Sequence, residues 1–316
     1  MTTIALGTAA LGRPQYINIK TADALINPDK DTLQSAAVTI LNTAYKLGIR
    51  HFDTAPGYGI AEEIILNWIK VFSITDVTVS TKWGYTYTAN FEQEPLQHEV
   101  KEHSLQVLQR QWQYSKNLLP YLNFYQIHSA TIESGVLNDK KILDMLAQLK
   151  QDYNIEIGIT TSGTNQRETI EKALTVEVDN KPLFSVFQVT YNIFEQSITD
   201  SIGLLKAIQA TVIVKEAMAN GRIYTNAGFE NYSQAYSVLA DLAKKYNTGT
   251  DAIALRFCMD SIQPSFVLSG AATINQLKEN LRANTFKLTD ADIDLLKSLK
   301  VNSENYWNER KQLRWN

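Results

Sequence analysis

Four residues that can hold or exchange a proton each follow a short apolar stretch of the sequence. Asp53 and Tyr58 stand in RHFDTAPGYG, Lys82 ends VTVSTK, and His128 ends NFYQIH. Their positions differ by 58 − 53 = 5, 82 − 58 = 24 and 128 − 82 = 46 residues. A carboxylate, a phenol, an ammonium and an imidazole that meet in space can pass a proton to or from a substrate. Taken singly, each is more typical of a turn, a solvated strand end or a packed core, so their positions in the fold decide.

The rest of the chain alternates short apolar runs with longer amphipathic segments, which is typical of parallel strands joined by helices. Asp31 stands where an N-cap is expected, and Gly48 stands where a left-handed residue would end the first long helix. Helices are expected at residues 31–48, 61–70, 95–118, 140–150 and 164–174. Strands are expected at residues 4–8, 50–54, 77–82, 123–128, 156–160, 185–190, 211–216 and 265–270.

These eight strands predict a (β/α)8 barrel, or TIM barrel, that forms a single domain over residues 1–316. A doubly wound sheet is the alternative, but it normally carries G-x-G-x-x-G after its first strand, where this chain has GTAALGRP. Residues 222–248 have room for an inserted loop and helix, and residues 301–316 form an aromatic tail. Such barrels gather the carboxyl ends of their strands at one mouth, so the four proton-exchanging residues should be neighbours.

Composition bounds the classes of function. The formal net charge is −3 and the sequence pI is about 5.9, so we expect no nucleic-acid partner and no membrane partner. Cys258 is the sole cysteine, which excludes an internal disulfide and suits a reducing compartment. The first residues lack a basic segment followed by an apolar one, and no uncharged run approaches the ~20 residues that span a bilayer. The sequence therefore predicts a soluble, cytoplasmic protein, for which we expect no metal site.

Seven segments identify a family resemblance because they occur in the family's order. The sequence resembles the aldo-keto reductases, which are (β/α)8-barrel oxidoreductases that bind NADP(H), less often NAD(H), without a Rossmann glycine motif. The segments are GIRHFDTAPGYG (48–59), VSTKWG (79–84), FYQIHS (124–129), GITTSG (158–163), FQVTYN (187–192), VIVKEAMANGR (212–222) and SGAATINQLKENL (269–281).

The resemblance implies that Tyr58 donates a proton to a substrate carbonyl and that Lys82, His128 and Asp53 are its catalytic partners. A phenol has an ordinary pKa of about 10, and acid–base work near neutrality needs a lowering worth about 4 kcal/mol. An ammonium at ~4 Å in an effective dielectric of ~20 offers an interaction of about that size. We therefore expect Lys82 to lower the pKa of Tyr58, and Asp53 to keep Lys82 charged.

The resemblance also implies a set of residues that bind the cofactor. Thr161 is an open alternative to Ser162, because the family more often has Ser-Asn there. Residues 270–280 lack the early Lys or Arg of many NADP-dependent members, so NADP(H) is expected with NAD(H) as the alternative. The expected cofactor residues are Thr8, Asp53, Ser162, Gln188, Lys215, Met218, Gly221, Arg222, Gly270, Thr273, Gln276, Glu279 and Asn280.

Trp83 and Tyr85 follow Lys82 and are expected to contact the substrate, while Trp307 and Trp315 lie in the tail. The expected function is an NAD(P)H-dependent oxidoreductase that interconverts an aldehyde, ketone or sugar carbonyl and its alcohol. One alternative is a cofactor-binding regulatory subunit resembling the potassium-channel β subunits. A barrel lyase that forms a Schiff base on Lys82 is disfavoured, because pairing with Asp53 would keep the lysine protonated.

Overall fold

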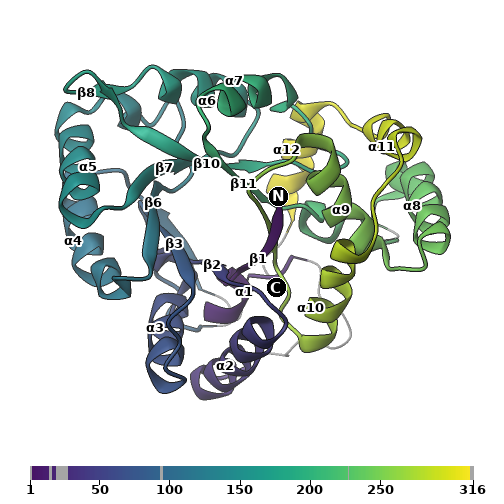
Figure 1. The fold of residues 1–316 in the computed structure, drawn as a ribbon, viewed down its shortest axis with the longest axis horizontal. Coiled ribbons are helices and arrows are strands. Elements are labelled where there is room, and N and C mark those ends of the chain that lie inside the picture. The colour runs from purple at the N-terminus through teal and green to yellow at the C-terminus, as the bar shows by residue number, and fades with distance from the viewer. Residues whose placement is uncertain (1, 14–15, 19–27, 93–94, 227, 314–316) are drawn as a thin grey trace.

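The protein folds as a closed barrel of eight parallel strands surrounded by helices (Figure 1). The computed structural model describes residues 2–13, 16–18, 28–92, 95–226 and 228–313. Around the barrel, the strands follow the order β1, β12, β11, β10, β7, β6, β3, β2. This architecture confirms the expected TIM barrel in a single domain. The barrel strands are β1 (Thr3–Gly7), β2 (His51–Asp53), β3 (Thr78–Trp83), β6 (Leu122–Ile127), β7 (Glu156–Thr160), β10 (Phe184–Thr190), β11 (Thr211–Lys215) and β12 (Phe266–Ser269).

Amphipathic helices cover the outside of the barrel. In α3, for example, Ile64, Ile65 and Trp68 are buried against the strands while Glu63 is exposed. Helix α9 differs because it is buried along most of its length, between the barrel and helices α8 and α10. The helices are α1 (Ala9–Gly12), α2 (Lys30–Lys46), α3 (Ala61–Val71), α4 (Leu105–Ser115), α5 (Lys140–Tyr153), α6 (Gln166–Leu174), α7 (Ile202–Ala207), α8 (Ser233–Lys245), α9 (Thr250–Ile262), α10 (Ile274–Leu281), α11 (Asp290–Lys297) and α12 (Ser303–Gln312).

The residues at the two ends of α2 differ in part from those expected from the sequence. Asp29, not Asp31, caps α2, because its carboxylate accepts a hydrogen bond from Thr32 N at 2.7 Å. Asp31 lies in the first turn, where an acidic side chain also suits the helix dipole. Gly48 follows α2 with a φ of +96°, as predicted for a left-handed C-terminal position.

The expected helix at 95–118 is wrong in its first half. Strand β4 (Tyr85–Tyr87) pairs antiparallel with β5 (Glu99–Lys101), so the chain after β3 forms a hairpin. Helix α4 begins only after Ser104, whose hydroxyl accepts from Val107 N at 3.3 Å. The amphipathic pattern therefore extended past the cap that sets the start of the helix.

The last third of the chain supplies the remaining cover. Residues 222–248 contain the short 3-10 helix η6 (Glu230–Tyr232) and helix α8, which packs on α9. Within the tail, α12 buries Tyr306 and Trp307, and Trp315 lies outside the described residues. No helix in the described part of the chain is long and apolar enough to cross a membrane.

The barrel interior changes character along its axis. Midway along the strands it holds a small apolar cluster of Ala5, Val186, Ile213 and Leu268, with Phe124 and Phe266 packed against it. Toward the carboxyl ends the buried residues are polar or charged, among them Asp53, Ser80, Lys82 and Gln188. A buried polar group is stable only when it is paired, so these residues must form a connected network.

Candidate active site

Asp53 and Lys82 form a buried ion pair at the ends of β2 and β3. Lys82 Nζ lies 2.6 Å from Asp53 Oδ2, and it also donates to Thr54 O at 2.9 Å. The Lys82 and Asp53 side chains are 0% and 2% exposed. Asp53 Oδ1 accepts from Ser80 Oγ at 2.6 Å and from Gln188 Nε2 at 2.8 Å. Each charge is therefore matched, which a site so far from water requires.

A short 3-10 turn, Pro56–Tyr58, presents Tyr58 beside this pair. Lys82 Nζ lies 4.8 Å from the centre of the Tyr58 ring. The ring also meets His128 edge to face, with centroids 5.6 Å apart. Gly59 ends the turn with a φ of +65°, and a Cβ there would lie 2.3 Å from Gly12 O. The turn therefore needs a glycine at position 59. Asp53, Tyr58, Lys82 and His128, the four residues expected to carry the chemistry, thus lie together at one mouth of the barrel.

The expected lowering of the pKa of Tyr58 is wrong for the chain without a ligand. Burial raises this pKa well above its ordinary value of 10, and the charge of Asp53 adds to the rise. The main physical reason is burial, because a phenolate loses more than a neutral phenol when it leaves water, and the negative charge of Asp53 works in the same direction. Tyr58 is therefore a protonated phenol at neutral pH.

His128 is a neutral imidazole at the same place. Burial lowers its pKa well below the ordinary value of 6.5, and the positive charges of Lys82 and Lys215 lower it further. Its Nδ1 is buried and has no hydrogen-bond partner among the described residues. The Tyr85 ring lies 4.5 Å from the His128 ring, so Tyr85 is a neighbour of this histidine.

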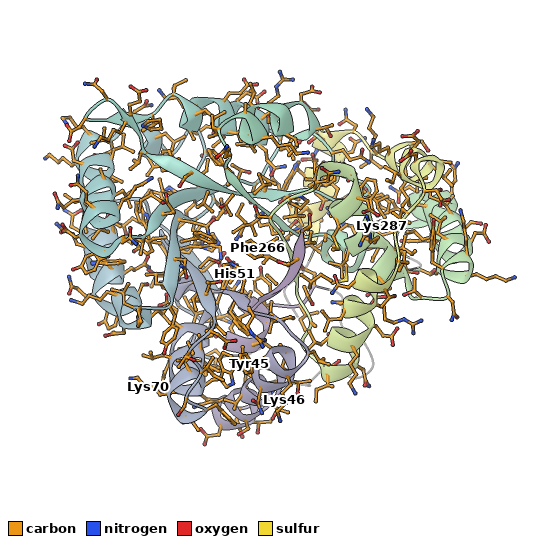
Figure 2. All side chains as sticks on the ribbon, viewed as in Figure 1. Tyr45, Lys46, His51, Lys70, Phe266 and Lys287 are labelled. Carbon is orange, nitrogen blue, oxygen red and sulfur yellow. The ribbon has the colours of Figure 1, made fainter. Side chains whose placement is uncertain are left out.

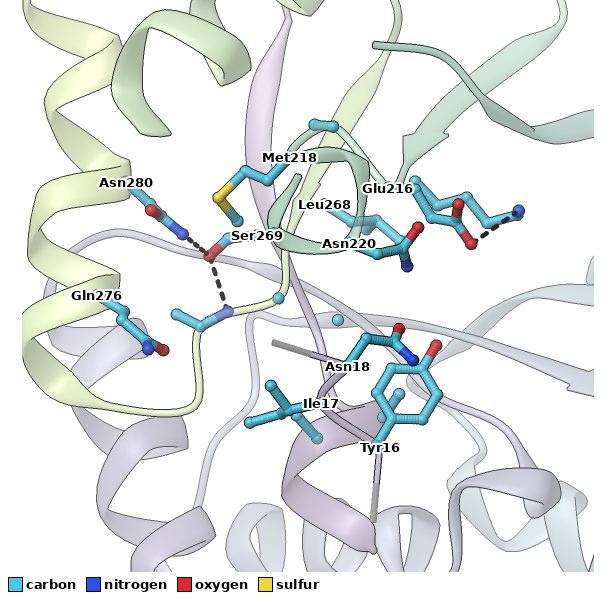
Figure 3. Close-up of a pocket in the computed structure, with 18 of the residues that line it drawn as sticks. Tyr16, Ile17, Asn18, Glu216, Met218, Asn220, Leu268, Ser269, Gln276 and Asn280 are labelled. Atoms are coloured by element: carbon cyan, nitrogen blue, oxygen red, sulfur yellow. Dashed lines mark hydrogen bonds and ion pairs between the residues drawn. The ribbon is translucent and has the colours of Figure 1, made fainter. Parts of the chain in front are cut away.

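An open cavity begins at Tyr58 and runs across the barrel mouth toward α10 (Figure 3). Asp53 and Gln188 border it inside the mouth, and Met218 and Gly221 border it above. At the far end Ser269 Oγ hydrogen-bonds the Asn280 amide at 2.8 Å and lies 3.3 Å from Ala271 N. The expected cofactor residues that line the cavity are Asp53, Gln188, Lys215, Met218, Gly221, Gly270, Gln276 and Asn280.

Three expected cofactor residues lie beside the cavity rather than in its lining. Thr8 Oγ1 donates to Asp53 O at 2.9 Å and so braces the end of the strand that carries Asp53. Ser162 Oγ accepts from Lys215 Nζ at 3.0 Å, and thus acts on the cavity through that lysine. Thr273 caps α10 by accepting from Gln276 N at 3.2 Å.

Three other residues that were expected to bind cofactor or substrate do not line the cavity. Arg222 is fully buried, with its guanidinium 4.0 Å from the centre of the Tyr306 ring and 3.3 Å from Glu309 Oε2, so it anchors α12. Glu279 is exposed and pairs with Arg282 at 3.5 Å. Trp83 is 0% exposed and packs edge to face on His103, so its side chain supports the barrel wall rather than contacting a substrate.

A set of polar residues that was not expected from the sequence also lines the cavity. Tyr16, Asn18, Glu216 and Asn220 line the cavity, and the Tyr16 ring meets Tyr58 edge to face with centroids 5.8 Å apart. Although burial acts to raise the pKa of Glu216, the cations Lys215 and Arg310 hold it below its ordinary value. Glu216 follows β11 directly, so the rule that strand ends face the mouth could have found it.

Glu216 also adopts a left-handed backbone with φ of +56°, which an L-residue rarely holds without a local reason. Its Oε1 lies 4.0 Å from Lys215 Nζ and 3.6 Å from Arg310 Nε, so a looser charge cluster lies at this edge of the mouth. Within the described ranges, no three His, Cys, Asp or Glu side chains are grouped so that they could hold a metal ion.

Comparison with known proteins agrees with this geometry. The sequence profile of the aldo/keto reductase family matches residues 3–301. The chain is 26% identical over 268 residues to the L-galactose dehydrogenase of Arabidopsis thaliana, covering 79% of this chain and 78% of that protein. It is 22% identical over 298 residues to the NADH-specific methylglyoxal reductase of Escherichia coli (strain K12), covering 83% and 86%. The fold matches the glycerol dehydrogenase of Gluconobacter oxydans with a TM-score of 0.71 at 20% identity, over 94% of this chain and 90% of that one. The chain therefore belongs to the aldo/keto reductase family, and it is an NAD(P)H-dependent oxidoreductase.

Proposed function

We propose that the protein reduces the carbonyl group of a small, polar, hydroxylated compound and that Tyr58 donates the proton. The observation that carries the proposal is the meeting of Tyr58, Lys82, Asp53 and His128 at one end of the open cavity. A protonated phenol that faces a cavity can act as a general acid, and the neighbouring ion pair holds its position.

The residues present fit a nicotinamide dinucleotide. The cavity leads from the proton donor to the amino end of α10, where backbone N–H groups suit a phosphate. A Cβ added at Gly270 would meet no atom within 4 Å, so a ligand can approach this backbone closely. Asn220 Oδ1 lies buried in the cavity wall without a hydrogen-bond partner among the described residues, and such an acceptor suits a hydroxyl group.

We further propose that NADH binds at least as tightly as NADPH. The cavity wall near α10 consists of Ser269, Gly270, Gln276 and Asn280, and Lys215 is the one Lys or Arg among the described lining residues. Lys215 ends β11, the strand that pairs with the one carrying Gln188, so the described wall near α10 offers no Lys or Arg side chain to a 2′-phosphate. The family resemblance alone predicts NADP(H). The names of the relatives do not favour either cofactor, since one relative is NADH-specific and another is NADP-dependent.

The roles of the chain's own groups follow from their positions. A bound reduced nicotinamide would supply the hydride that adds to the carbonyl carbon. The Tyr58 hydroxyl gives its proton to the carbonyl oxygen, so the C=O group becomes H–C–O–H. The phenolate that remains is stabilised by the Lys82 ammonium. Neutral His128, beside Tyr58, can donate a second hydrogen bond to the same oxygen.

The polar residues that line the cavity support the substrate class. Tyr16, Asn18, Glu216 and Asn220 would offer donors and acceptors to substrate hydroxyl groups, whereas a large apolar aldehyde would use none of them. The relatives named as L-galactose dehydrogenase and glycerol dehydrogenase act on compounds of this kind. A substrate with several hydroxyl groups therefore fits better than an aromatic aldehyde.

Two assays on the purified chain test the proposal. NADH and NADPH are first titrated by quenching of intrinsic fluorescence. Their consumption is then followed with D-glyceraldehyde, L-galactose and 4-nitrobenzaldehyde. We expect both dinucleotides to bind, with a higher kcat/KM for the hydroxylated compounds. Failure of both dinucleotides to bind would overturn the proposal. Binding without any turnover would favour the regulatory-subunit alternative, because that alternative requires only the bound dinucleotide.

A further inference from the structure

His51 lies inside the barrel, one layer below the catalytic ion pair. It begins β2 two residues before Asp53, and it is 2% exposed. Its ring stacks on Phe266 with centroids 4.3 Å apart and lies 5.4 Å from Phe124. Figure 2 places His51 and Phe266 close together within the ring of strands. No part of the proposed chemistry so far uses this imidazole.

Counting protons fixes the direction of the hydrogen bonds between His51 and the carboxylate of Asp53. Ser80 Oγ lies 2.6 Å from Asp53 Oδ1, and an ionised carboxylate can only accept, so the single Ser80 hydroxyl proton points there. His51 Nε2 lies 3.1 Å from the same Ser80 Oγ. Because that oxygen has no second proton, His51 Nε2 must carry a hydrogen and donate it.

The other ring nitrogen completes the assignment. Burial lowers the pKa of His51 to about 4, the nearby Lys82 charge also lowers it, and the Asp53 charge opposes them. These are the two charged groups that act on the ring, and at neutral pH it is uncharged with one N–H. Nδ1 is therefore an acceptor, and the Thr78 hydroxyl donates to it at 2.8 Å in preference to Arg50 O, which lies farther away at 3.4 Å.

We propose that His51 is a positioning residue for the proton-transfer site. Its Nε2–H holds the Ser80 oxygen, which turns the Ser80 proton onto Asp53 and so fixes the carboxylate that holds Lys82 beside Tyr58. The chain of donors runs from Thr78 through His51 and Ser80 to Asp53, and each step is a contact of 3.1 Å or less. The link to turnover rests on the proposed function, whereas the tautomer of His51 does not.

The tautomer is measured first, on the ligand-free protein. The chain has four histidines, so nitrogen-15 labelled histidine gives a spectrum in which His51→Phe identifies the His51 signals. We expect proton-coupled nitrogen NMR at neutral pH to show Nε2–H and unprotonated Nδ1. The Nε2 signal should move in Ser80→Ala. A His51 that carries its proton on Nδ1 would overturn the proposal.

Kinetics then separate positioning from packing with two complementary variants. His51→Phe keeps the stacked ring but loses the donor, whereas His51→Gln loses the ring but can place an amide N–H near the position of Nε2. We expect kcat for D-glyceraldehyde reduction to fall about tenfold in His51→Phe, in line with the loss of one buried hydrogen bond, and to recover in His51→Gln. KM and dinucleotide affinity should change by less than about twofold, because His51 touches neither ligand.

Ser80→Ala should match His51→Phe in kcat, and the double variant should cost little more than either change alone, since both act through Asp53. Full activity in His51→Phe with loss in His51→Gln would show that the ring acts by packing, and would overturn the proposal. A wild-type protein that binds dinucleotides but reduces no carbonyl would instead overturn the proposed function. The NMR result would still decide whether the donor chain exists.

Discussion

Two lysines end barrel strands at the same mouth, and their surroundings differ. Lys82 on β3 is fully buried and lies 2.6 Å from the carboxylate of Asp53. Lys215 on β11 borders the cavity, donates to Thr190 Oγ1 at 2.6 Å and Ser162 Oγ at 3.0 Å, and has its nearest carboxylate, Glu216, at 4.0 Å. Neutral hydroxyls position a charge without balancing it, whereas a carboxylate at 2.6 Å does both.

This difference assigns the lysines different roles. The negative charge of Asp53 largely cancels the electric field of Lys82 at long distance. We therefore expect Lys82 to act only on close neighbours such as the Tyr58 phenol, and to hold those groups in position. The positive charge of Lys215 is less completely balanced than that of Lys82. Burial lowers the pKa of Lys215, although the charge of Glu216 acts to raise it. A group of this kind is suited to meeting a ligand's negative or carbonyl oxygen. Sequence position at a strand end alone does not separate these roles.

The largest effect is expected for Lys82→Met. Turnover should fall by about 10²–10⁴-fold, because the phenolate loses its cation. The free energy of unfolding should fall by about 3–5 kcal/mol, since Asp53 is left as an unpaired buried charge. Urea denaturation and NADH-consumption assays measure the two effects. The double variant Asp53→Asn/Lys82→Met should recover stability but not turnover. A single variant as stable as wild type would contradict the assigned ion pair.

The buried surroundings of Lys82 also predict an acid sensitivity. The pKa of His51 is about 4 in the folded protein and about 6.5 when unfolded, so between these values the unfolded chain binds more protons. Stability should therefore fall as the pH drops from 6.5 to 4, with about 3 kcal/mol arising from His51. Urea denaturation at several pH values should show a weaker pH dependence in His51→Phe. Lys206→Met, at an exposed position of α7, should keep the wild-type dependence. Equal pH profiles for wild type and His51→Phe would contradict the burial of His51.

Lys215→Met should act on binding more than on stability. The hydroxyls of Thr190 and Ser162 can bond elsewhere, and Glu216 keeps Arg310 at 3.6 Å, so no carboxylate is left without a cation. We expect dinucleotide affinity to fall about tenfold, which is the size of one hydrogen bond to a charged group. Fluorescence titration measures this loss, with Lys206→Met on exposed α7 as a matched control. Unchanged affinity would remove Lys215 from the cofactor site.

The smallest effect concerns the end of the cavity farthest from both lysines. Gln276→Arg would place a cation near the amino end of α10, where the described wall has none. NADPH affinity should rise about fivefold, while NADH affinity stays unchanged, because only NADPH carries the extra phosphate. Calorimetric titration with both dinucleotides checks this, and Gln276→Glu serves as the opposite-charge control. An equal change for both dinucleotides would place the phosphate elsewhere.

The alternation of apolar runs predicted the barrel and its eight strands. A parallel strand that is buried on both faces must consist mostly of apolar residues, so it can be recognised in the sequence as a short apolar run. The hairpin of β4 and β5 was not predicted. Its strands are short and half-buried, and amphipathic residues that pair across a hairpin resemble a helix face when sequence alone is considered. The start of α4 depended on the cap at Ser104, which is a local hydrogen bond rather than a pattern.

The meeting of Asp53, Tyr58, Lys82 and His128 was predictable, since each lies at or just beyond the carboxyl end of a barrel strand and strand ends converge. The electrostatics were not. Burial of the phenol and the nearby charge of Asp53 raise the pKa of Tyr58, and no spacing in the sequence encodes the extent of either effect. Arg222 likewise looked suited to phosphate, but the Tyr306 ring and Glu309 of α12 engage its guanidinium, and those residues are more than 80 positions away.

Substitution of Tyr58 by phenylalanine, with turnover and dinucleotide affinity measured on the same sample, tests the central claim most directly. The phenylalanine ring would keep the packing against Tyr16 and His128 and lose only the hydroxyl that gives the proton. We expect NADH affinity within about twofold of wild type and a kcat lower by about 10²–10⁴-fold on the substrate that the parent reduces best. A Tyr58→Phe protein that keeps near wild-type kcat on that substrate would contradict this claim.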